Sequence, residues 1–131
     1  FSTDGTKMYI TGHSNTSGKV HQYTLSTAFD LSTASYDSVS FLLTGQTAAH
    51  YDIAFNTDGT KMYILGYLDQ TVYQYTLSTG FDVSTSSYDS VSFTVSSQET
   101  APYDFAFSSD GTKMYMSGVL VDKVHQYSTG L

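Results

Sequence analysis

Residues 53–66 read IAFNTDGTKMYILG, and residues 105–118 read FAFSSDGTKMYMSG. The string Asp-Gly-Thr-Lys-Met-Tyr occurs three times, starting at Asp4, Asp58 and Asp110, so its spacings are 54 and 52 residues. A second stretch, residues 22–41, matches residues 74–93 at 17 of 20 positions. Self-similarity at a fixed period is the signature of a repeat architecture. The chain is therefore a tandem array with a period of about 52 residues.

The unit from Tyr51 to Gln98 predicts four β-strands. Strands are expected at 51–55, 61–65, 71–77 and 90–95, because these runs alternate or are rich in β-branched and aromatic residues. Asp-Gly at 58–59 predicts a hairpin turn between the first two, since glycine accepts a positive φ. Residues 78–89 are rich in hydroxyl groups and are expected to form a long connection.

Four antiparallel strands in every 40 to 50 residues are typical of a β-propeller blade. A blade lies between two neighbours, so both of its faces are buried. Strand 71–77 agrees, with Val72 on one face and Tyr73, Tyr75 and Leu77 on the other. We therefore expect an all-β fold, a partial β-propeller of four-stranded antiparallel blades with a period of about 52 residues and roughly two and a half blades.

The pattern (I/F)AFxxDGTKMY(I/M)xG, followed by V(Y/H)QY, resembles the β-propeller repeats of the YVTN and lactonase-like type. That resemblance implies a propeller and identifies no catalytic residue here. Thr-Asp-Gly or Ser-Asp-Gly stands where many relatives have Pro-Asp-Gly. The connection FDxSTxSYDS, at 29–38 and 81–90, is similar to repeats of large bacterial surface proteins and phage structural proteins.

The strand order predicts an incomplete blade at 1–50, a complete blade at 51–98 and an incomplete blade at 99–131. The first unit lacks its first strand except Phe1, and the last unit lacks its fourth. We therefore expect a fragment or a processed piece of a longer protein. Open blade faces invite association, so the expected partners are further blades of the same polypeptide or other copies of the chain. Identical copies of the chain are not expected to join into complete blades, because the first unit lacks its first strand and the last unit lacks its fourth.

Composition excludes several classes of function. The chain has 131 residues and a net charge of −7, with five lysines and no arginine. Nucleic-acid binding is not expected, because phosphates are bound by clustered Lys and Arg. No apolar run approaches the length of a membrane span, so no membrane insertion is expected. Serine and threonine make up about 30 % of the chain, which favours an extracellular, cell-surface or virion-surface location.

Asp52 and Asp104 are candidates for binding a ligand or an ion. Each lies at the start of a predicted innermost strand, on the side of the small alanine that faces the ring axis. Carboxylates arranged around a channel would repel one another and raise their pKa values unless a cation or water compensates. The alternative is that both are polar groups satisfied by hydrogen bonds at the mouth of the channel.

Tyr67 is the third candidate site residue. It lies in the loop 66–70, which differs in sequence from the equivalent loops 118–123 and 12–19. Variable loops on a repeated scaffold usually carry binding specificity. An exposed tyrosine in such a loop could stack on a carbohydrate, and a protein ligand is an alternative.

The remaining polar residues are expected mainly to form turns or to pack, and not to take part in catalysis. The aspartates that precede glycine lack the further oxygens of a calcium loop and are expected to form turns. Asp30, Asp37, Asp82 and Asp89 are expected in turns of the long connection, with a surface cation as the alternative. His21 and His125 take the place of Tyr73 and are expected to pack, while His13 and His50 fall in or near loops. No catalytic motif, metal-ligand spacing or cofactor fingerprint occurs, so we expect no catalytic residue, no metal and no cofactor.

Three functions remain open. The first is a non-catalytic propeller segment for binding, adhesion or structural presentation at a cell or virion surface, which near-identical repeats favour because catalysis needs an asymmetric constellation. The alternative is a fragment of a lactonase-like or quinoprotein-like enzyme whose active site lies in blades absent here. An intracellular scaffold is the third, and the arginine-free composition weighs against it.

Overall fold

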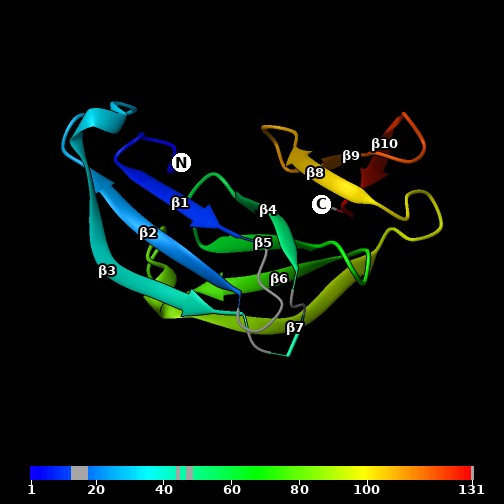
Figure 1. The fold of residues 1–131 in the computed structure, drawn as a ribbon, viewed down its shortest axis with the longest axis horizontal. Helices are drawn as coiled ribbons and strands as arrows, with labels where there is room; N and C mark the ends of the chain where they lie inside the picture. Colours follow the sequence, from blue (N-terminus) through cyan, green and yellow to red (C-terminus); the bar gives the residue numbers. More distant parts are fainter. Residues whose placement is uncertain (13–17, 44, 47–48, 131) are drawn as a thin grey trace.

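The computed structural model describes residues 1–12, 18–43, 45–46 and 49–130 and folds them into ten strands in three antiparallel sheets (Figure 1). The first sheet has the order β1 (Lys7–Thr11), β2 (Lys19–Leu25) and β3 (Ala34–Leu42). The middle sheet has the order β4 (His50–Phe55), β5 (Lys61–Gly66), β6 (Thr71–Leu77) and β7 (Ser86–Thr94). The third sheet contains β8 (Pro102–Phe107), β9 (Lys113–Gly118) and β10 (Val124–Ser128). The predicted all-β class is confirmed.

Two single-turn 3-10 helices, η1 (Leu31–Thr33) and η2 (Val83–Thr85), precede the last strands of the first two sheets. Asp30 and Asp82 cap them, because each carboxylate accepts a hydrogen bond at 3.0 Å from the backbone N–H of Ser32 or Ser84. The prediction that these two aspartates form turns is confirmed.

The Asp-Gly pairs form the tight turns that the sequence predicts. The carboxylate of Asp58 accepts hydrogen bonds from the backbone N–H of Thr60 at 2.9 Å and from its hydroxyl at 2.6 Å. Gly59 has a φ of 72°, in the left-handed region that favours glycine. Turn formation thus accounts for the recurring Asp-Gly pair.

The predicted start of the fourth strand was wrong. The strand was expected over 90–95, yet β7 begins at Ser86, inside the predicted connection. The pairing of β6 with β7 shifts in register between Gln74 and Tyr75, and Ser90 has a φ of 57°. A β-bulge therefore interrupts the alternation of apolar and polar residues, so the hydroxyl-rich half of the strand reads as a loop.

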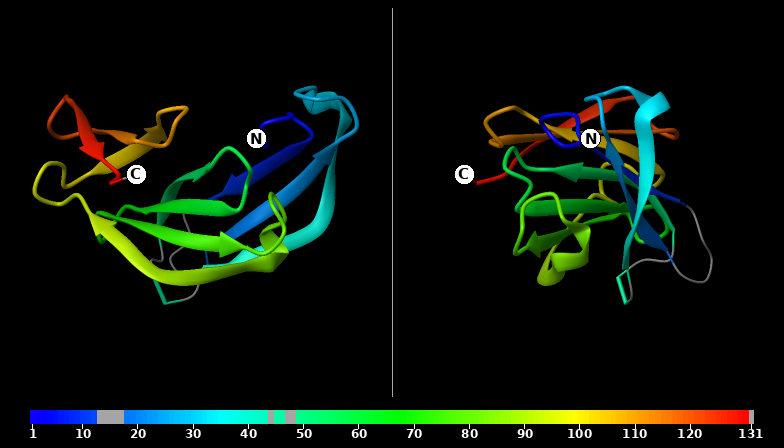
Figure 2. Two further views of the ribbon diagram at one scale, coloured as in Figure 1. Left: turned by 180° about the vertical axis from the view of Figure 1, so that it is seen from behind. Right: turned by 90° about the vertical axis from the view of Figure 1, so that its left-hand side faces the viewer.

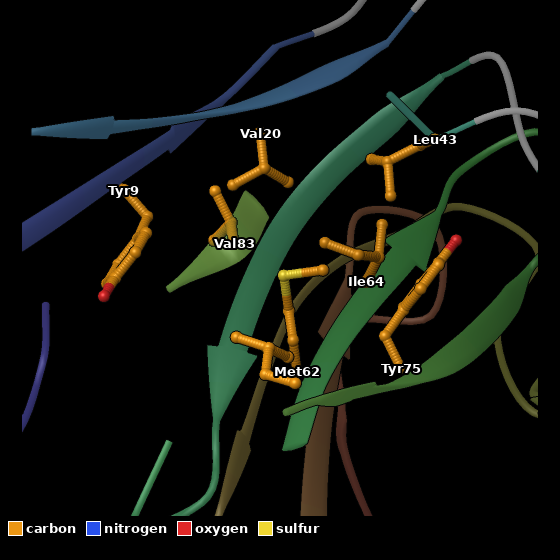
Figure 3. Packing of buried hydrophobic residues seen from close by; sticks show 8 residues of the cluster. Tyr9, Val20, Leu43, Met62, Ile64, Tyr75 and Val83 are labelled. Carbon is orange, nitrogen blue, oxygen red and sulfur yellow. The ribbon is translucent and has the colours of Figure 1, made fainter. Parts of the chain in front are cut away.

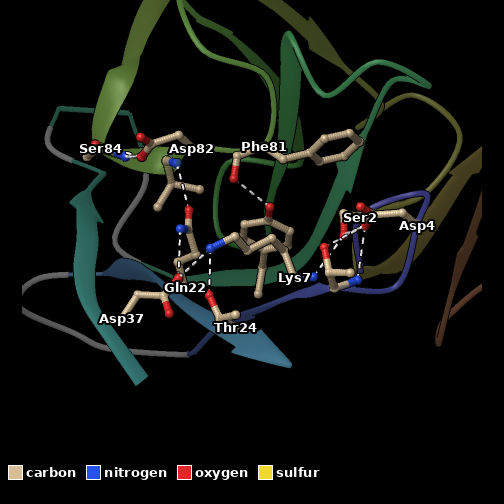
Figure 4. A network of polar contacts seen from close by, with 12 residues as sticks. Ser2, Asp4, Lys7, Gln22, Thr24, Asp37, Phe81, Asp82 and Ser84 are labelled. Carbon is tan, nitrogen blue, oxygen red and sulfur yellow. Dashed lines mark hydrogen bonds and ion pairs between the residues drawn. The ribbon is translucent and has the colours of Figure 1, made fainter. Parts of the chain in front are cut away.

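Asp37 and Asp89 lie in strands β3 and β7, not in turns of the connection as predicted. Their carboxylates accept from the lysine Nζ atoms of Lys7 at 2.9 Å and of Lys61 at 2.8 Å. Burial alone would raise the pKa of both carboxyls, but hydrogen bonds and the lysine charges lower it below its ordinary value. Figure 4 shows the first of these ion pairs beside Gln22 and Thr24.

The middle sheet packs between the other two, as the left view in Figure 2 shows. Its face toward the first sheet carries Tyr75 and Leu77, and its face toward the third carries Val72. The prediction that both faces of strand 71–77 are buried is confirmed. The core between the first and middle sheets is shown in Figure 3, and its buried members are Tyr9, Val20, Leu43, Met62, Ile64, Tyr75, Leu77 and Val83.

His50 was expected in or near a loop and instead lies in β4, where it is 1 % exposed. Gly18 makes room for it, since a Cβ at that glycine would lie 1.2 Å from the imidazole Nε2. His21 and His125 lie in β2 and β10, and the ring of His21 packs 5.8 Å from that of Tyr36. His13 lies outside the described residues.

Candidate functional site

Strands β4 and β8 are the first strands of their sheets, and they lie side by side. The Oδ2 atom of Asp52 in β4 accepts a hydrogen bond at 3.0 Å from the backbone N–H of Phe105 in β8. Each strand has an irregularity at its start, where the pairing skips Tyr51 in β4 and Tyr103 in β8. These β-bulges give the two neighbouring strands the same local shape and place a tyrosine in the same position on each.

Three aromatic rings follow one another at this edge, and we call Tyr67, Tyr51 and Tyr103 the tyrosine row. The ring centroids of Tyr51 and Tyr67 are 4.6 Å apart, and those of Tyr51 and Tyr103 are 4.8 Å apart. Tyr103 is 52 % exposed. The structure therefore brings the predicted site residue Tyr67 into a continuous row of aromatic rings.

Tyr51 and Tyr103 could have been found from the repeat. They precede the two candidate aspartates directly and are 52 residues apart, so they hold equivalent positions. What no local pattern indicates is that Tyr67, from the loop after β5, reaches the same row.

Asp52 and Asp104, which follow Tyr51 and Tyr103 in the sequence, lie next to one another. Burial is the main cause that raises the pKa of Asp52 to about 6, and the neighbouring carboxyl of Asp104 adds to it. Hydrogen bonds from the backbone N–H groups of Phe105 and Ile53 oppose the rise, the latter at 2.8 Å. The site thus pairs acceptor oxygens with aromatic rings, a combination that suits a neutral ligand with hydroxyl groups.

The raised pKa of Asp52 predicts that stability increases as the pH falls from 7 toward 4. The folded chain holds this proton more tightly than the unfolded chain, whose aspartate keeps the ordinary value of 3.8. Protonation therefore stabilises the fold below pH 6, and we expect a gain of about 1 to 2 kcal/mol in the free energy of unfolding, after allowance for solvent screening. Urea unfolding at pH 4, 5, 6 and 7 measures this change in the free energy of unfolding.

The variant Asp52→Asn serves as the control for this pH effect, because it removes the titrating carboxyl and should flatten the profile between pH 4 and 6. Other aspartates oppose this effect near pH 4. Hydrogen bonds from neighbouring serine and threonine groups lower the pKa values of Asp4 and Asp110 to about 2, and the pKa values of Asp30, Asp37, Asp58 and Asp89 are lowered as well. Their contribution to stability is lost as the pH falls toward the ordinary value of 3.8 and below it, in wild type and variant alike. A wild-type chain whose stability changes between pH 7 and 5 no differently from that of Asp52→Asn would contradict the prediction.

The described residues contain no group of three or more His, Cys, Asp or Glu that could hold a metal ion. Ligand or ion binding by Asp52, Asp104 and Tyr67 stays a prediction. Of the three variable loops, 66–70 and 118–123 are described, whereas residues 13–17 of the remaining one are not.

A separate cleft of about 1090 Å³ opens between the middle and third sheets. Gln74, Val91 and Phe93 line it from the middle sheet, and Met114 and Tyr127 line it from the third. The equivalent space between the first and middle sheets is filled by η2, whose Val83 is fully buried. No short-range sequence pattern indicates this cleft, because its walls come from two different sheets that face one another only in the folded chain.

No protein-family model matches the chain, and a search of curated proteins finds no match either. Within the described ranges, no helix is long and apolar enough to cross a membrane.

Proposed function

We propose that the chain is a segment of a β-propeller that binds carbohydrate without catalysis, at a cell or virion surface, through the tyrosine row. The single observation that carries this proposal is the row of tilted, contacting rings of Tyr67, Tyr51 and Tyr103 beside two acceptor carboxylates. Tyrosine rings offer large, rigid apolar faces to a sugar ring, and their hydroxyls and the aspartates can accept hydrogen bonds from sugar hydroxyls.

The propeller architecture is supported by the way in which the sheets stack. The sheets follow one another in chain order, each packs face to face on the next, and their first strands β4 and β8 are neighbours. Blades of a propeller stack in this way around a central axis, with the first strand of each blade innermost. In such a ring, every complete repeat would add one bulged tyrosine and one aspartate to the same rim.

The surface location is supported by composition. Acidic side chains and hydroxyl groups dominate the polar residues, and arginine is absent. Such a surface fits an adhesive or presenting role better than a contact with nucleic acid.

A glycan array probed with the chain tests the proposal, followed by calorimetric titration with the oligosaccharide that binds. Tyr103→Ala should weaken binding at least about tenfold, because it removes an exposed ring from the end of the row. Phe93→Ala is the matched control: Phe93 is 49 % exposed, against 52 % for Tyr103, but it lies in β7, at the far edge of the middle sheet.

Two results would remove the proposal. One is an array on which no glycan binds the folded chain. The other is a glycan whose affinity falls equally with Tyr103→Ala and with Phe93→Ala, because the row would then have no special part in binding.

A further inference from the structure

The contact between consecutive sheets is made twice in this chain, by equivalent residues in nearly the same geometry. Tyr9 of the first sheet stacks on Phe55 of the middle sheet with ring centroids 4.4 Å apart and an interplanar angle of 43°. Tyr63 of the middle sheet stacks on Phe107 of the third at 4.5 Å and 47°. One face of each sheet is therefore built to receive the opposite face of another such sheet.

The segment around η2 adds hydrogen bonds that fix how the middle sheet sits on the first sheet. The backbone N–H of Val83 donates to the side-chain oxygen of Gln22 at 3.0 Å, and the hydroxyl of Tyr9 donates to the carbonyl of Phe81 at 2.6 Å (Figure 4). Val83 itself lies in the core between the sheets (Figure 3). We call residues 81–83 the middle plug and the equivalent residues 29–31 the first plug.

The first plug has the same shape as the middle plug but is uncovered. Phe29 has a φ of 61° and Phe81 a φ of 63°, and a capping aspartate follows each. Leu31, which corresponds to Val83, is 62 % exposed, against 0 % for Val83. The outer face of the first sheet thus presents a formed plug with nothing from the described chain over it.

Phe1 extends this open face. It corresponds to Phe55, and its ring lies 5.6 Å from that of Phe29, just as Phe55 lies 5.7 Å from Phe81. Phe1 is exposed as well. It is therefore placed to stack on a tyrosine of a neighbouring sheet, as Phe55 stacks on Tyr9.

The outer face of the third sheet carries a surface that matches such a plug. We call its residues Tyr115, Val124 and Gln126 the receptor. Val124 is 70 % exposed, whereas its equivalent Val20 in the first sheet is 0 % exposed under the middle sheet. Tyr115 and Gln126 hold the positions of Tyr9 and Gln22, and both are exposed to solvent. The two ends of the molecule thus carry the two halves of the contact that holds its own sheets together.

We propose that a second copy of this chain docks head to tail, with the outer face of its first sheet on the outer face of the third sheet. Leu31 of one copy then covers Val124 of the other, its backbone N–H donates to Gln126, and Phe1 stacks on Tyr115. The contact continues the interface already present between the sheets, and it is heterologous because the two surfaces differ. The proposal does not depend on what the tyrosine row binds.

The end-to-end contact is smaller than the internal ones. The third sheet contains no described strand equivalent to β3, and the first sheet contains none equivalent to β4. We therefore expect association that is reversible and depends on concentration, in the range of weak interfaces. The absence of these two strands reduces the area of the contact between copies. The first plug and the receptor on the third sheet are both still present.

Sedimentation velocity over a concentration series tests the proposal with two exposed-site variants. Leu31→Asp disables the plug, and Val124→Asp disables the receptor, so each variant alone should be monomeric. An equal mixture of the two should form a 1:1 complex, because the first variant keeps an intact receptor and the second keeps an intact plug. The wild-type chain should associate at the same concentrations.

Leu120→Asp is the matched control, since it places the same charge at an exposed leucine. Leu120 is 67 % exposed, and its equivalent Leu68 stays 62 % exposed although the third sheet packs on the middle one. This position therefore lies outside the stacking contact, and the variant should associate like the wild type. Circular dichroism verifies that all three variants are folded.

Three outcomes would overturn the proposal. A wild-type chain that stays monomeric at millimolar concentration would leave another repeat of a longer polypeptide as the occupant of these faces. Self-association of either single variant with wild-type strength would indicate a symmetric contact. Two monomeric variants that fail to combine would show that plug and receptor do not meet.

Discussion

Val83→Asp is expected to lower the free energy of unfolding by about 4 kcal/mol, whereas Leu31→Asp should change it by less than about 0.5 kcal/mol. The two residues hold equivalent positions in segments of nearly identical sequence. Val83 is fully buried between two sheets, so the substitution removes apolar burial and places a carboxylate in the core. Leu31 lies on an open face, where water solvates the new charge.

Urea denaturation of dilute protein measures this difference, because dilution keeps the first plug free of a second copy. Val83→Ala provides an intermediate point, with an expected loss of about 2 kcal/mol from the missing methyl groups and the cavity they leave. Equal losses for Val83→Asp and Leu31→Asp would contradict the stacked arrangement, because they would mean that the two plugs have the same surroundings.

Glu99→Ala is expected to lower the free energy of unfolding by about 3 kcal/mol. Glu99 is the only glutamate of the chain and is fully buried in the loop between β7 and β8. Its carboxylate accepts hydrogen bonds from the backbone N–H of Ala101 at 2.8 Å and of Val121 at 3.3 Å. Alanine leaves the buried donor of Ala101 without an acceptor and opens a cavity beside Gly118.

The control is Glu99→Gln, which keeps the volume of the side chain and one acceptor oxygen, so its loss should be about 1 kcal/mol. Gly118→Ala probes the same packing from the other side, since a Cβ there would lie 2.2 Å from the carboxyl carbon of Glu99. The comparison is made by urea unfolding at pH 7. Similar small losses of stability for the alanine and glutamine variants would contradict the prediction. They would show that the buried carboxylate does not hold the loop between β7 and β8 to the loop between β9 and β10.

The strands and turns of this protein could be predicted because their causes are local. The Asp-Gly turn depends on a carboxylate and a glycine a few bonds apart, and each run of alternating residues carries its own strand signal. The order of strands within each sheet followed from the repeat, as did the burial of both faces of β6. The candidate Asp52 was also identified in this way, from its place at the start of a strand.

Features that depend on distant partners were missed. The bulge that hid the first half of β7 arises from its pairing with β6, and Asp89 pairs with Lys61 across the sheet. His50 is buried because Gly18, far away in sequence, has no side chain to occupy its place. In each case the deciding contact joins residues that no short window contains.

The sequence alone determined the repeating unit and its all-β character. The reason is that the alternation of apolar and polar residues in a strand and the preference of Asp-Gly for a turn both depend only on residues close together in the chain. Only the tertiary structure decided what the repeats do to one another. Stacking brings Tyr51 and Tyr103 together with Tyr67, buries Val83 and leaves its equivalent Leu31 exposed. Nearly identical segments thus have different environments, since burial is set by which sheet lies opposite and not by the residues themselves.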